Sequence, residues 1–303
     1  MNATQVFEPN EAVAARAAEI RTTLERDGVF VVRGLLTESE IARAREQVSA
    51  RLQRGGRRLA LGRTQPGAAI LPELGWVLAH PRIVAVFRTL LGPHELRFTG
   101  HCDIHRNIVS GWHKDSGETY GGYFTGDYFA ADDCRVYKAA IYLQDAGERD
   151  ALRVRLGSHR SADLLAGREV KVLTKRGDVV FFDVRLNHCG QIPDRIERGI
   201  QLVAKVATRG SRAKQEPTWV SGLREAYLRA RGREDRLSVF FTYGAANRYT
   251  EEFAAANMRR QLRQAGAPEA ALAPGLVRAL QEQGVPLCEA AREHAGVEGR
   301  SQE

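Results

Sequence analysis

The chain has 303 residues, of which 43% are hydrophobic and 27% are charged, so it can bury the core of at least one large domain. This composition excludes a disordered chain, a collagen-like chain and a small scaffold that depends on disulfides. Lys and Arg total 45 against 37 Asp and Glu, and the formal net charge of +8 would suit an anionic partner such as a nucleic acid. Only six of these cations are Lys, and an excess of Arg is typical of a GC-rich genome, so charge alone does not identify a partner.

The cysteines and the N-terminus bear on the cellular compartment. The four Cys are scattered without a Cys-x-x-Cys motif, which indicates neither a zinc ribbon nor a disulfide framework. The first dozen residues include acidic side chains and lack the apolar core of a signal peptide, and no window approaches about eighteen uninterrupted apolar residues. We therefore expect a cytoplasmic protein without a membrane segment, and the sequence leaves the oligomeric state open.

Residues 1–94 are expected to be mainly helical. Apolar residues spaced by three and four predict a helix over 9–27, and a Thr-x-x-Glu capping box at Thr37 predicts a second helix over 37–52. A buried strand is predicted between them, over 29–36. Helical spacing returns over 71–91, with a break at Pro81.

Beyond Pro93 the pattern changes to short strands separated by Gly, Asp and Asn turns, which is typical of a barrel or a double-sheet jelly roll. Strands are predicted over 95–102, 109–114, 135–144, 152–156, 170–174, 178–183 and 199–208. After Pro217, helices are predicted over 220–231, 251–264 and 276–283, with a strand-like piece at 238–244. The predicted fold is a single domain over 1–303, mainly β with flanking helices: a helical lead-in (1–94), a double-stranded β-helix or cupin-like jelly-roll core (95–208), and a helical C-terminal extension (209–303).

Two His-x-Asp tripeptides occur in the predicted core, one formed by His101 and Asp103 and the other by His113 and Asp115. Residues i and i+2 of a strand point to the same face, so such a pair can bind one metal ion from the wall of a barrel. We favour His113 and Asp115, because a turn with a flanking Trp accompanies them. His101 and Asp103 stay open as the alternative pair, and a core histidine bonded within the sheet is the other interpretation of His101.

His188 is the best candidate for a third ligand, because it lies where the apolar strand 178–183 ends. Two imidazoles and one carboxylate on one face of an octahedron leave three open positions, as in non-haem Fe(II) oxygenases. A zinc hydrolase would more often use three histidines or a His-Glu-x-x-His helix, and that motif is absent from the sequence. Ten residues further on, Arg198 is expected to open a neighbouring strand at the bottom of the pocket, where a guanidinium can bind a carboxylate through two parallel hydrogen bonds.

Four segments carry a resemblance to a known family: Gly111-Trp-His-Lys-Asp-Ser-Gly117, Leu156-Gly-Ser-His-Arg160, Arg176-Gly-Asp-Val-Val-Phe-Phe-Asp183, and His188 followed by Arg198. In this order they resemble the phytanoyl-CoA dioxygenase family of Fe(II)- and 2-oxoglutarate-dependent oxygenases. The resemblance extends over about residues 27–208 and includes the lead-in DGVFVVRGLLTESEI. It implies a double-stranded β-helix with Fe(II) and 2-oxoglutarate as cofactors.

Carried over to this chain, the resemblance implies that His113, Asp115 and His188 bind iron and act in catalysis, and that Arg198 binds the distal carboxylate of 2-oxoglutarate. Arg195 is the fallback, because the interval from His188 to Arg198 is about one residue short. Three departures from the family pattern are Lys114, where Gln is common, Leu156 in place of Pro, and Gly190 in place of a small hydroxyl residue.

The resemblance further implies oxidation of a small molecule by O2. Because Asp115 is present, halogenation is not expected, since halogenating members replace this carboxylate with a small residue. Hydroxylation is the default outcome, and desaturation and oxidative ring closure stay open. Tyr137 and Lys138 are neighbours on the next predicted strand, so one of them faces inward, and either is a candidate to contact the co-substrate.

The size, the GC-rich composition and the aromatic loop 120–129 resemble those of antibiotic-tailoring oxygenases, so we predict a sugar-containing natural product as the substrate. The loop is a candidate lid, and Asp127, Asp132 and Asp133 are candidates to bind amino groups of such a substrate. Two alternatives stay open. One is a nucleic-acid demethylase of the same fold, although its two Arg bracketing the last strand are not evident and no nucleic acid is expected. The other is a non-catalytic jelly-roll binding protein.

Overall fold

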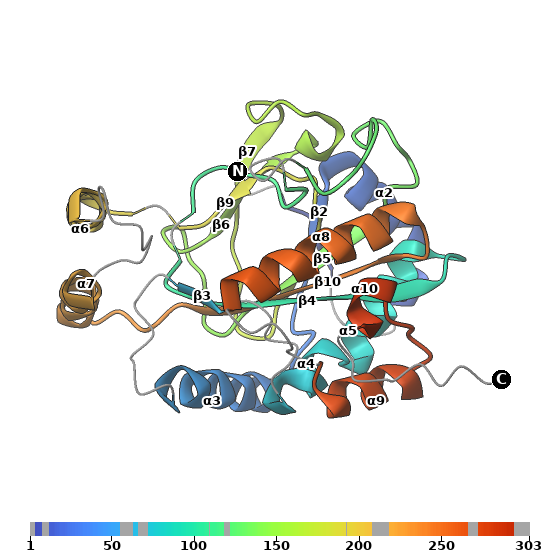
Figure 1. The fold of residues 1–303 in the computed structure, drawn as a ribbon. Coiled ribbons are helices and arrows are strands. Elements are labelled where there is room, and N and C mark those ends of the chain that lie inside the picture. Colours follow the sequence, from blue (N-terminus) through green and yellow to red (C-terminus); the bar gives the residue numbers. More distant parts are fainter. Residues whose placement is uncertain are drawn as a thin grey trace.

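The computed structural model describes residues 4–7, 12–54, 63–65, 72–108, 110–117, 122–191, 193–207, 218–265 and 272–293. In this part of the chain, two sheets face each other and helices cover the outer side of the larger sheet (Figure 1). The larger sheet consists, in spatial order, of β1 (Val6–Phe7), β2 (Val29–Val32), β8 (Val179–Asp183), β5 (Val136–Tyr142), β10 (Leu237–Ala245), β4 (Leu96–Arg106) and β3 (Arg63–Gln65). The smaller sheet consists of β7 (Arg168–Val172), β6 (Leu152–Leu156) and β9 (His188–Cys189). The predicted fold class, a mainly β jelly roll with flanking helices, is confirmed.

The helices come from both ends of the chain. Before the strands of the core stand α1 (Ala12–Ala15), α2 (Ala17–Asp27), α3 (Glu38–Arg54), a 3-10 turn (Pro72–Leu74), α4 (Gly75–Leu78) and α5 (Pro81–Leu91). A second 3-10 turn (Ser158–Arg160) follows β6, and the remaining helices are α6 (Arg195–Ala207), α7 (Thr218–Ala230), α8 (Arg248–Ala265), α9 (Pro274–Glu282) and α10 (Glu289–Arg292). The capping box before α3 is present: Thr37 N donates to Glu40 Oε2 (2.7 Å), and Glu40 N donates to Thr37 Oγ1 (3.2 Å).

Alternation along the strands of the larger sheet divides the core in two. On the outer face, Phe181 and Tyr243 pack against Phe87 of α5, with ring centroids 5.3 and 4.6 Å apart. On the inner face, Phe182 and Phe240 join a smaller apolar cluster with residues of β6. Apolar side chains of the inner face therefore fill part of the space between the two sheets.

The strand predicted over 199–208 is wrong, because residues 195–207 form helix α6 and residue 208 lies outside the described residues. Asp194 and Glu197 begin this helix with a reciprocal cap: Asp194 N donates to Glu197 Oε2 (3.0 Å), and Glu197 N donates to Asp194 Oδ1 (2.9 Å). The β-branched residues of this segment suit a strand, but Ile196, Ile200 and Val203 are spaced by four and three, which is the helical period.

The strand that completes the larger sheet comes from the C-terminal extension. The strand-like piece at 238–244 is β10, which lies antiparallel to both β4 and β5. The sheet therefore draws β1, β2, β3 and β10 from outside the range 95–208. The strand predicted over 109–114 is replaced, in the described residues 110–114, by one isolated bridge between His113 and His188.

Two further observations bear on the expectations from composition. The four cysteines are free and buried. Among the described helices, none is by itself long and apolar enough to cross a membrane; only the bent pair Pro72–Leu78 and Pro81–Leu91, at 45°, meets that test, by length and composition alone. The cytoplasmic location stays a prediction.

Candidate active site

His113, Asp115 and His188 converge at one point, with one potential ligand atom from each within 4.8 Å of the others. Nε2 of His188 lies 3.4 Å from Asp115 Oδ2, and Nε2 of His113 lies 3.9 Å from Asp115 Oδ1. Two backbone hydrogen bonds between His113 and His188, of 3.0 and 2.9 Å, hold the histidines side by side although 75 positions of sequence separate them. The structure therefore brings together the three residues that the sequence predicts as ligands.

The two histidines are oriented in the same way. Nδ1–H of His113 donates to the carbonyl of Gly111 (2.8 Å), and Nδ1–H of His188 donates to the carbonyl of Leu186 (3.0 Å). A ring nitrogen that donates to a carbonyl carries the proton, so each Nε2 keeps its lone pair and faces Asp115. Such outer hydrogen bonds fix the tautomer and the ring orientation of metal-binding histidines, so this donor set fits a divalent iron ion.

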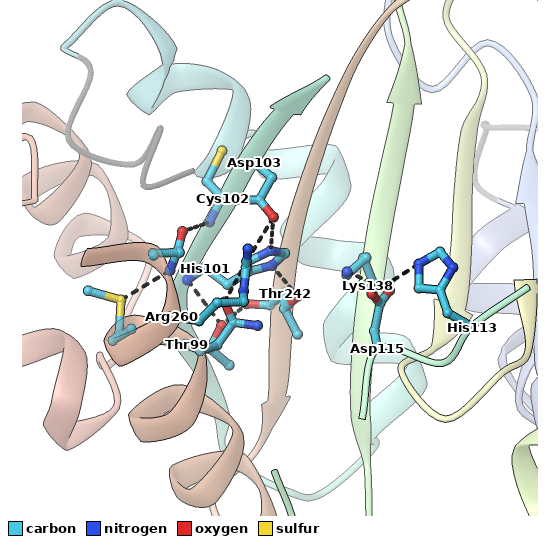
Figure 2. A network of polar contacts seen from close by, with 12 residues as sticks. Thr99, His101, Cys102, Asp103, His113, Asp115, Lys138, Thr242 and Arg260 are labelled. Carbon is cyan, nitrogen blue, oxygen red and sulfur yellow. Dashed lines mark hydrogen bonds and ion pairs between the residues drawn. The ribbon is translucent and has the colours of Figure 1, made fainter. Parts of the chain in front are cut away.

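The protonation states also suit metal binding. Burial lowers the pKa of His188 to about 3, so its imidazole is neutral near neutral pH. Burial opposes ionisation of Asp115, but Lys138 and the two histidines together hold the pKa of this carboxyl well below its ordinary value. Lys138 Nζ donates to Asp115 Oδ2 at 2.6 Å (Figure 2). A carboxylate and a neutral imidazole are the forms that bind a metal ion without first losing a proton.

The three residues line a cavity of about 590 Å³. Its wall comes from both sheets, from the segment 110–117 and from α8, and it includes Asp103, His105, Lys138, Tyr142, Leu152, Arg236, Phe240, Asn257 and Arg260. Burial lowers the pKa of His105 to about 3, and its ring packs on Phe240 with centroids 4.6 Å apart. The cavity is large enough for a co-substrate and a small molecule together.

Of the two predicted co-substrate contacts on β5, Lys138 lines the cavity and Tyr137 does not. Tyr137 faces the outer helices in the larger apolar cluster, where burial raises its pKa. Lys138 therefore faces the cavity and Tyr137 faces away from it, because successive side chains of a strand point to opposite faces.

Arg198 does not reach the cavity. It is exposed on α6, its Nε donates to the carbonyl of Asp194 (3.4 Å), and neither Arg198 nor the fallback Arg195 is among the residues that line the cavity. The prediction that Arg198 binds the co-substrate depends on a strand at 199–208, whereas the cap at Asp194 starts helix α6 there.

The sequence interpretation missed Arg236, which directly precedes β10 and lines the cavity. Only 8% of Arg236 is exposed, and its guanidinium carbon lies 4.9 Å from the centre of the Tyr142 ring. Nη1 donates to the carbonyl of Ile108 (3.4 Å), whereas the buried Nε has no hydrogen-bond partner among the described residues. In the sequence, Arg236 stands out only as an Arg two positions before the strand-like piece at 238–244.

The alternative tripeptide forms a separate network (Figure 2). His101 is fully buried, its Nδ1 is hydrogen-bonded to Thr242 Oγ1 (2.7 Å), and its Nε2–H donates to Asp103 Oδ2 (3.1 Å). Arg260 Nη2 donates to the same oxygen of Asp103 at 2.8 Å. Burial lowers the pKa of His101 to about 4. Both of its ring nitrogens are engaged, so His101 is the core histidine of the second interpretation.

The aromatic loop packs onto α8 in its described part, 122–129. Tyr123 lines the cavity, and its ring lies 5.7 Å from that of Phe253. Asp127, Asp132 and Asp133 are not among the residues that line the cavity. Residues 120 and 121 of the candidate lid lie outside the described residues.

The fold, the three ligands and the cavity define a class of protein, the non-haem iron dioxygenases. Comparison with protein families agrees: the phytanoyl-CoA dioxygenase (PhyH) family model matches residues 24–191, and the chain belongs to this family. It is accordingly a non-haem Fe(II)- and 2-oxoglutarate-dependent dioxygenase, with Fe(II) and 2-oxoglutarate as cofactors. No curated protein matches the chain.

Several solved structures share the fold. SnoK, a non-haem α-ketoglutarate-dependent carbocyclase from nogalamycin biosynthesis, has a TM-score of 0.52 and 19% identity over 76% of this chain and 84% of its own. SnoN, a non-haem α-ketoglutarate-dependent epimerase from the same biosynthesis, has a TM-score of 0.51 and 19% identity over 77% of this chain and 83% of its own. HygX from Streptomyces hygroscopicus has a TM-score of 0.50 and 17% identity over 75% of this chain and 86% of its own.

Proposed function

We propose that this enzyme oxidises a sugar-containing natural product in antibiotic biosynthesis, by hydroxylation or oxidative cyclisation, with iron held by His113, Asp115 and His188. The observation that carries this proposal is the convergence of three ligand atoms within 4.8 Å in the wall of a cavity. SnoK and SnoN, which share the fold, come from nogalamycin biosynthesis, which supports a role in making a natural product.

The residues around the ligands prepare the site. Gly111 and Leu186 accept the Nδ1–H groups of His113 and His188, so that both Nε2 atoms are available to the metal ion. Lys138 engages Oδ2 of Asp115, which leaves Oδ1 as the carboxylate oxygen without an ammonium partner. Bound iron and 2-oxoglutarate supply the activation of O2 that oxidation of a carbon atom requires.

Arg236, in place of Arg198, is the residue that we assign to the distal carboxylate of 2-oxoglutarate. Two other cations of the cavity wall are already paired with carboxylates, Lys138 with Asp115 and Arg260 with Asp103. Within the described residues, Arg236 has no carboxylate partner, although it is buried beside Tyr142. A buried guanidinium binds a carboxylate strongly because the fork of N–H donors matches both oxygens.

The proposal is tested with the purified protein, Fe(II) and 2-oxoglutarate labelled at C1. We expect about one iron per chain, and release of labelled CO2 with formation of succinate as the co-substrate is consumed. His188→Ala removes the buried ligand and should abolish both iron binding and turnover. His94→Ala, which changes an exposed histidine away from the cavity, is the matched control. Unchanged turnover in His188→Ala would contradict the assignment of His188 as an iron ligand.

A further inference from the structure

The cavity wall contains a second polar group that iron and 2-oxoglutarate do not use. Asp103 of β4 and Arg260 and Asn257 of α8 line the same cavity as the three iron ligands. We propose that the Asp103–Arg260 pair, with Asn257, binds the hydroxyl groups of a neutral polyol substrate, such as a sugar or cyclitol ring. This inference rests on the proposed function and names the chemical class of its substrate.

The geometry of the pair offers an acceptor and a donor side by side. Arg260 Nη2 donates to Asp103 Oδ2 (2.8 Å) and to Asn257 Oδ1 (2.9 Å). Oδ2 of Asp103 also accepts from His101, while Oδ1 is buried and has no hydrogen-bond partner among the described residues. A buried carboxylate oxygen without a partner is unfavourable, and a ligand hydroxyl would satisfy it. A hydroxyl donates to a carboxylate and accepts from a guanidinium or an amide, so a pair of adjacent hydroxyls matches this group.

The balance of charge in the wall favours a neutral ligand. Asp103 is paired with Arg260, and Asp115 with Lys138 (Figure 2). Lys114, also in the wall, donates its ammonium to the carbonyls of Ser158 (2.6 Å) and Arg185 (2.8 Å). Once Arg236 holds the co-substrate, the charged side chains among the described residues of this wall are each engaged by an opposite charge or by backbone carbonyls.

The remaining titratable groups of the wall agree with this balance. Burial keeps the imidazole of His105 neutral by lowering its pKa to about 3. An ammonium placed on Asp103 would lie beside the Arg260 guanidinium, and an anion placed on Arg260 would lie beside the Asp103 carboxylate. Both arrangements bring like charges together in a buried site, whereas a hydroxyl group does not.

A purely structural role is the competing explanation. The pair joins β4 to α8, and these two elements pack against each other. A pair that only anchors α8 would affect folding stability and leave the choice of ligand unchanged. The two roles therefore differ in ligand selectivity, which binding measurements report directly.

The test uses three ring compounds of similar size as probes: myo-inositol (neutral), 2-deoxystreptamine (a dication) and glucuronate (an anion). The protein is loaded with Ni(II) and 2-oxoglutarate, and each dissociation constant is measured by saturation-transfer NMR. We expect myo-inositol to bind at least about tenfold more tightly than either charged probe, since one like-charge contact costs about that much. Absence of myo-inositol binding, or tighter binding of the dication or the anion, overturns the inference.

Variants then assign the selectivity to the pair. Asp103→Asn should weaken myo-inositol binding at least about tenfold, the loss expected for one hydrogen bond to a charged group. Asp235→Asn is the matched control, because it removes the carboxylate that pairs with Arg106, another residue of β4, outside the cavity. Because Asp103→Asn leaves Arg260 without its carboxylate, the double variant Asp103→Asn/Arg260→Gln is measured as well, and folding is checked by thermal melting. A lower melting temperature with an unchanged dissociation constant overturns the inference.

The outcomes separate this inference from the proposed function. If the wild-type protein fails to bind Ni(II) with 2-oxoglutarate, the proposed function fails, and the inference falls with it. If the metal ion and 2-oxoglutarate bind but the protein binds myo-inositol no more tightly than the charged probes, the proposed function stands and the inference alone is wrong.

Discussion

The segments 101–103 and 113–115 carry the same His-x-Asp pattern, and Asp103 and Asp115 line the same cavity, yet their histidines differ in their hydrogen bonds. His113 donates Nδ1–H to a backbone carbonyl and keeps Nε2 for a ligand, 3.9 Å from Asp115. His101 has one nitrogen on Thr242 and the other on Asp103. Nε2 of His113 is therefore available to a metal ion, whereas neither ring nitrogen of His101 is. The His-x-Asp spacing is the same in both tripeptides and does not distinguish them.

The third group at each site explains the difference. Both carboxylates bear a cation, Lys138 on Asp115 at 2.6 Å and Arg260 on Asp103 at 2.8 Å, but beside Asp115 there is also the imidazole of His188, whose Nε2 lies 3.4 Å from Oδ2. The second imidazole, and not the charge at the carboxylate, therefore separates the two sites. A His-x-Asp tripeptide therefore predicts a metal site only together with the residue that the fold brings to it from another element.

The largest effect expected from this comparison is on metal affinity. His188→Ala should weaken Fe(II) or Ni(II) binding by more than about 100-fold, since changes in the outer shell alone cost about 10- to 100-fold. His101→Gln should leave the affinity unchanged, because its nitrogens serve Thr242 and Asp103. Calorimetry under anaerobic conditions measures both. An equal loss in the two variants would mean that the two tripeptides do not differ as described.

The second effect concerns the guanidiniums. Because Arg260 is paired with Asp103, we expect Arg236 to bind the distal carboxylate of 2-oxoglutarate. Arg236→Met should therefore raise the KM for 2-oxoglutarate about 10- to 100-fold, the range for hydrogen bonds to charged groups. Arg198→Met, which changes an exposed residue of α6, is the control and should leave the KM unchanged. Steady-state turnover across 2-oxoglutarate concentrations measures the effect. The reverse ranking of these variants would restore Arg198 as the co-substrate residue.

These two arginines show how much of the site the sequence could predict. The i and i+2 spacing of His113 and Asp115 and the strand end before His188 suffice to predict that these residues meet, although residues 110–114 form only an isolated bridge to His188. Arg236 could not be found in the same way, since α6 and α7 separate it in sequence from the ligands. Residues 199–208 are predicted as a strand that Arg198 opens because their β-branched residues suit a strand. The cap formed by Asp194 and Glu197 instead starts a helix there.

The fold was more predictable than the wall of the cavity. Strand composition and turn spacing predicted β5, β6 and β8 to within two residues at each end, and the capping box predicted the start of α3. The contribution of α8 to the wall through Asn257 and Arg260 depends on how a helix packs across a sheet, which its own sequence does not encode. Local pattern therefore predicts elements, and long-range packing decides which polar groups meet.

The third prediction concerns the pH dependence of stability. The pKa of His101 falls from 6.5 to about 4 on folding, because burial disfavours the protonated imidazole. The contribution of neutral His101 to the free energy of unfolding is therefore complete above pH 6.5 and is lost as the pH falls towards 4. His188 and His105 act in the same direction. His101→Gln should remove about 1.4 kcal/mol per pH unit from the slope of unfolding free energy against pH in this window. Urea unfolding at several pH values measures the slope, and an unchanged slope in the variant would contradict the burial of a neutral His101.

The smallest expected effect separates the middle residues of the two tripeptides. Lys114 Nζ donates to the carbonyls of Ser158 and Arg185, whereas Cys102 belongs to the outer apolar core. Lys114→Gln keeps an N–H donor but not the charge, so it should cost about 1 kcal/mol of unfolding free energy and weaken metal binding less than about tenfold. Cys102→Ala should cost a similar amount by leaving a small cavity, with no change in metal affinity. Urea unfolding and calorimetry on the same samples measure both quantities. A change in metal affinity in both variants would mean that general loosening of the sheets, rather than the bonds made by Lys114, positions the ligands beside it.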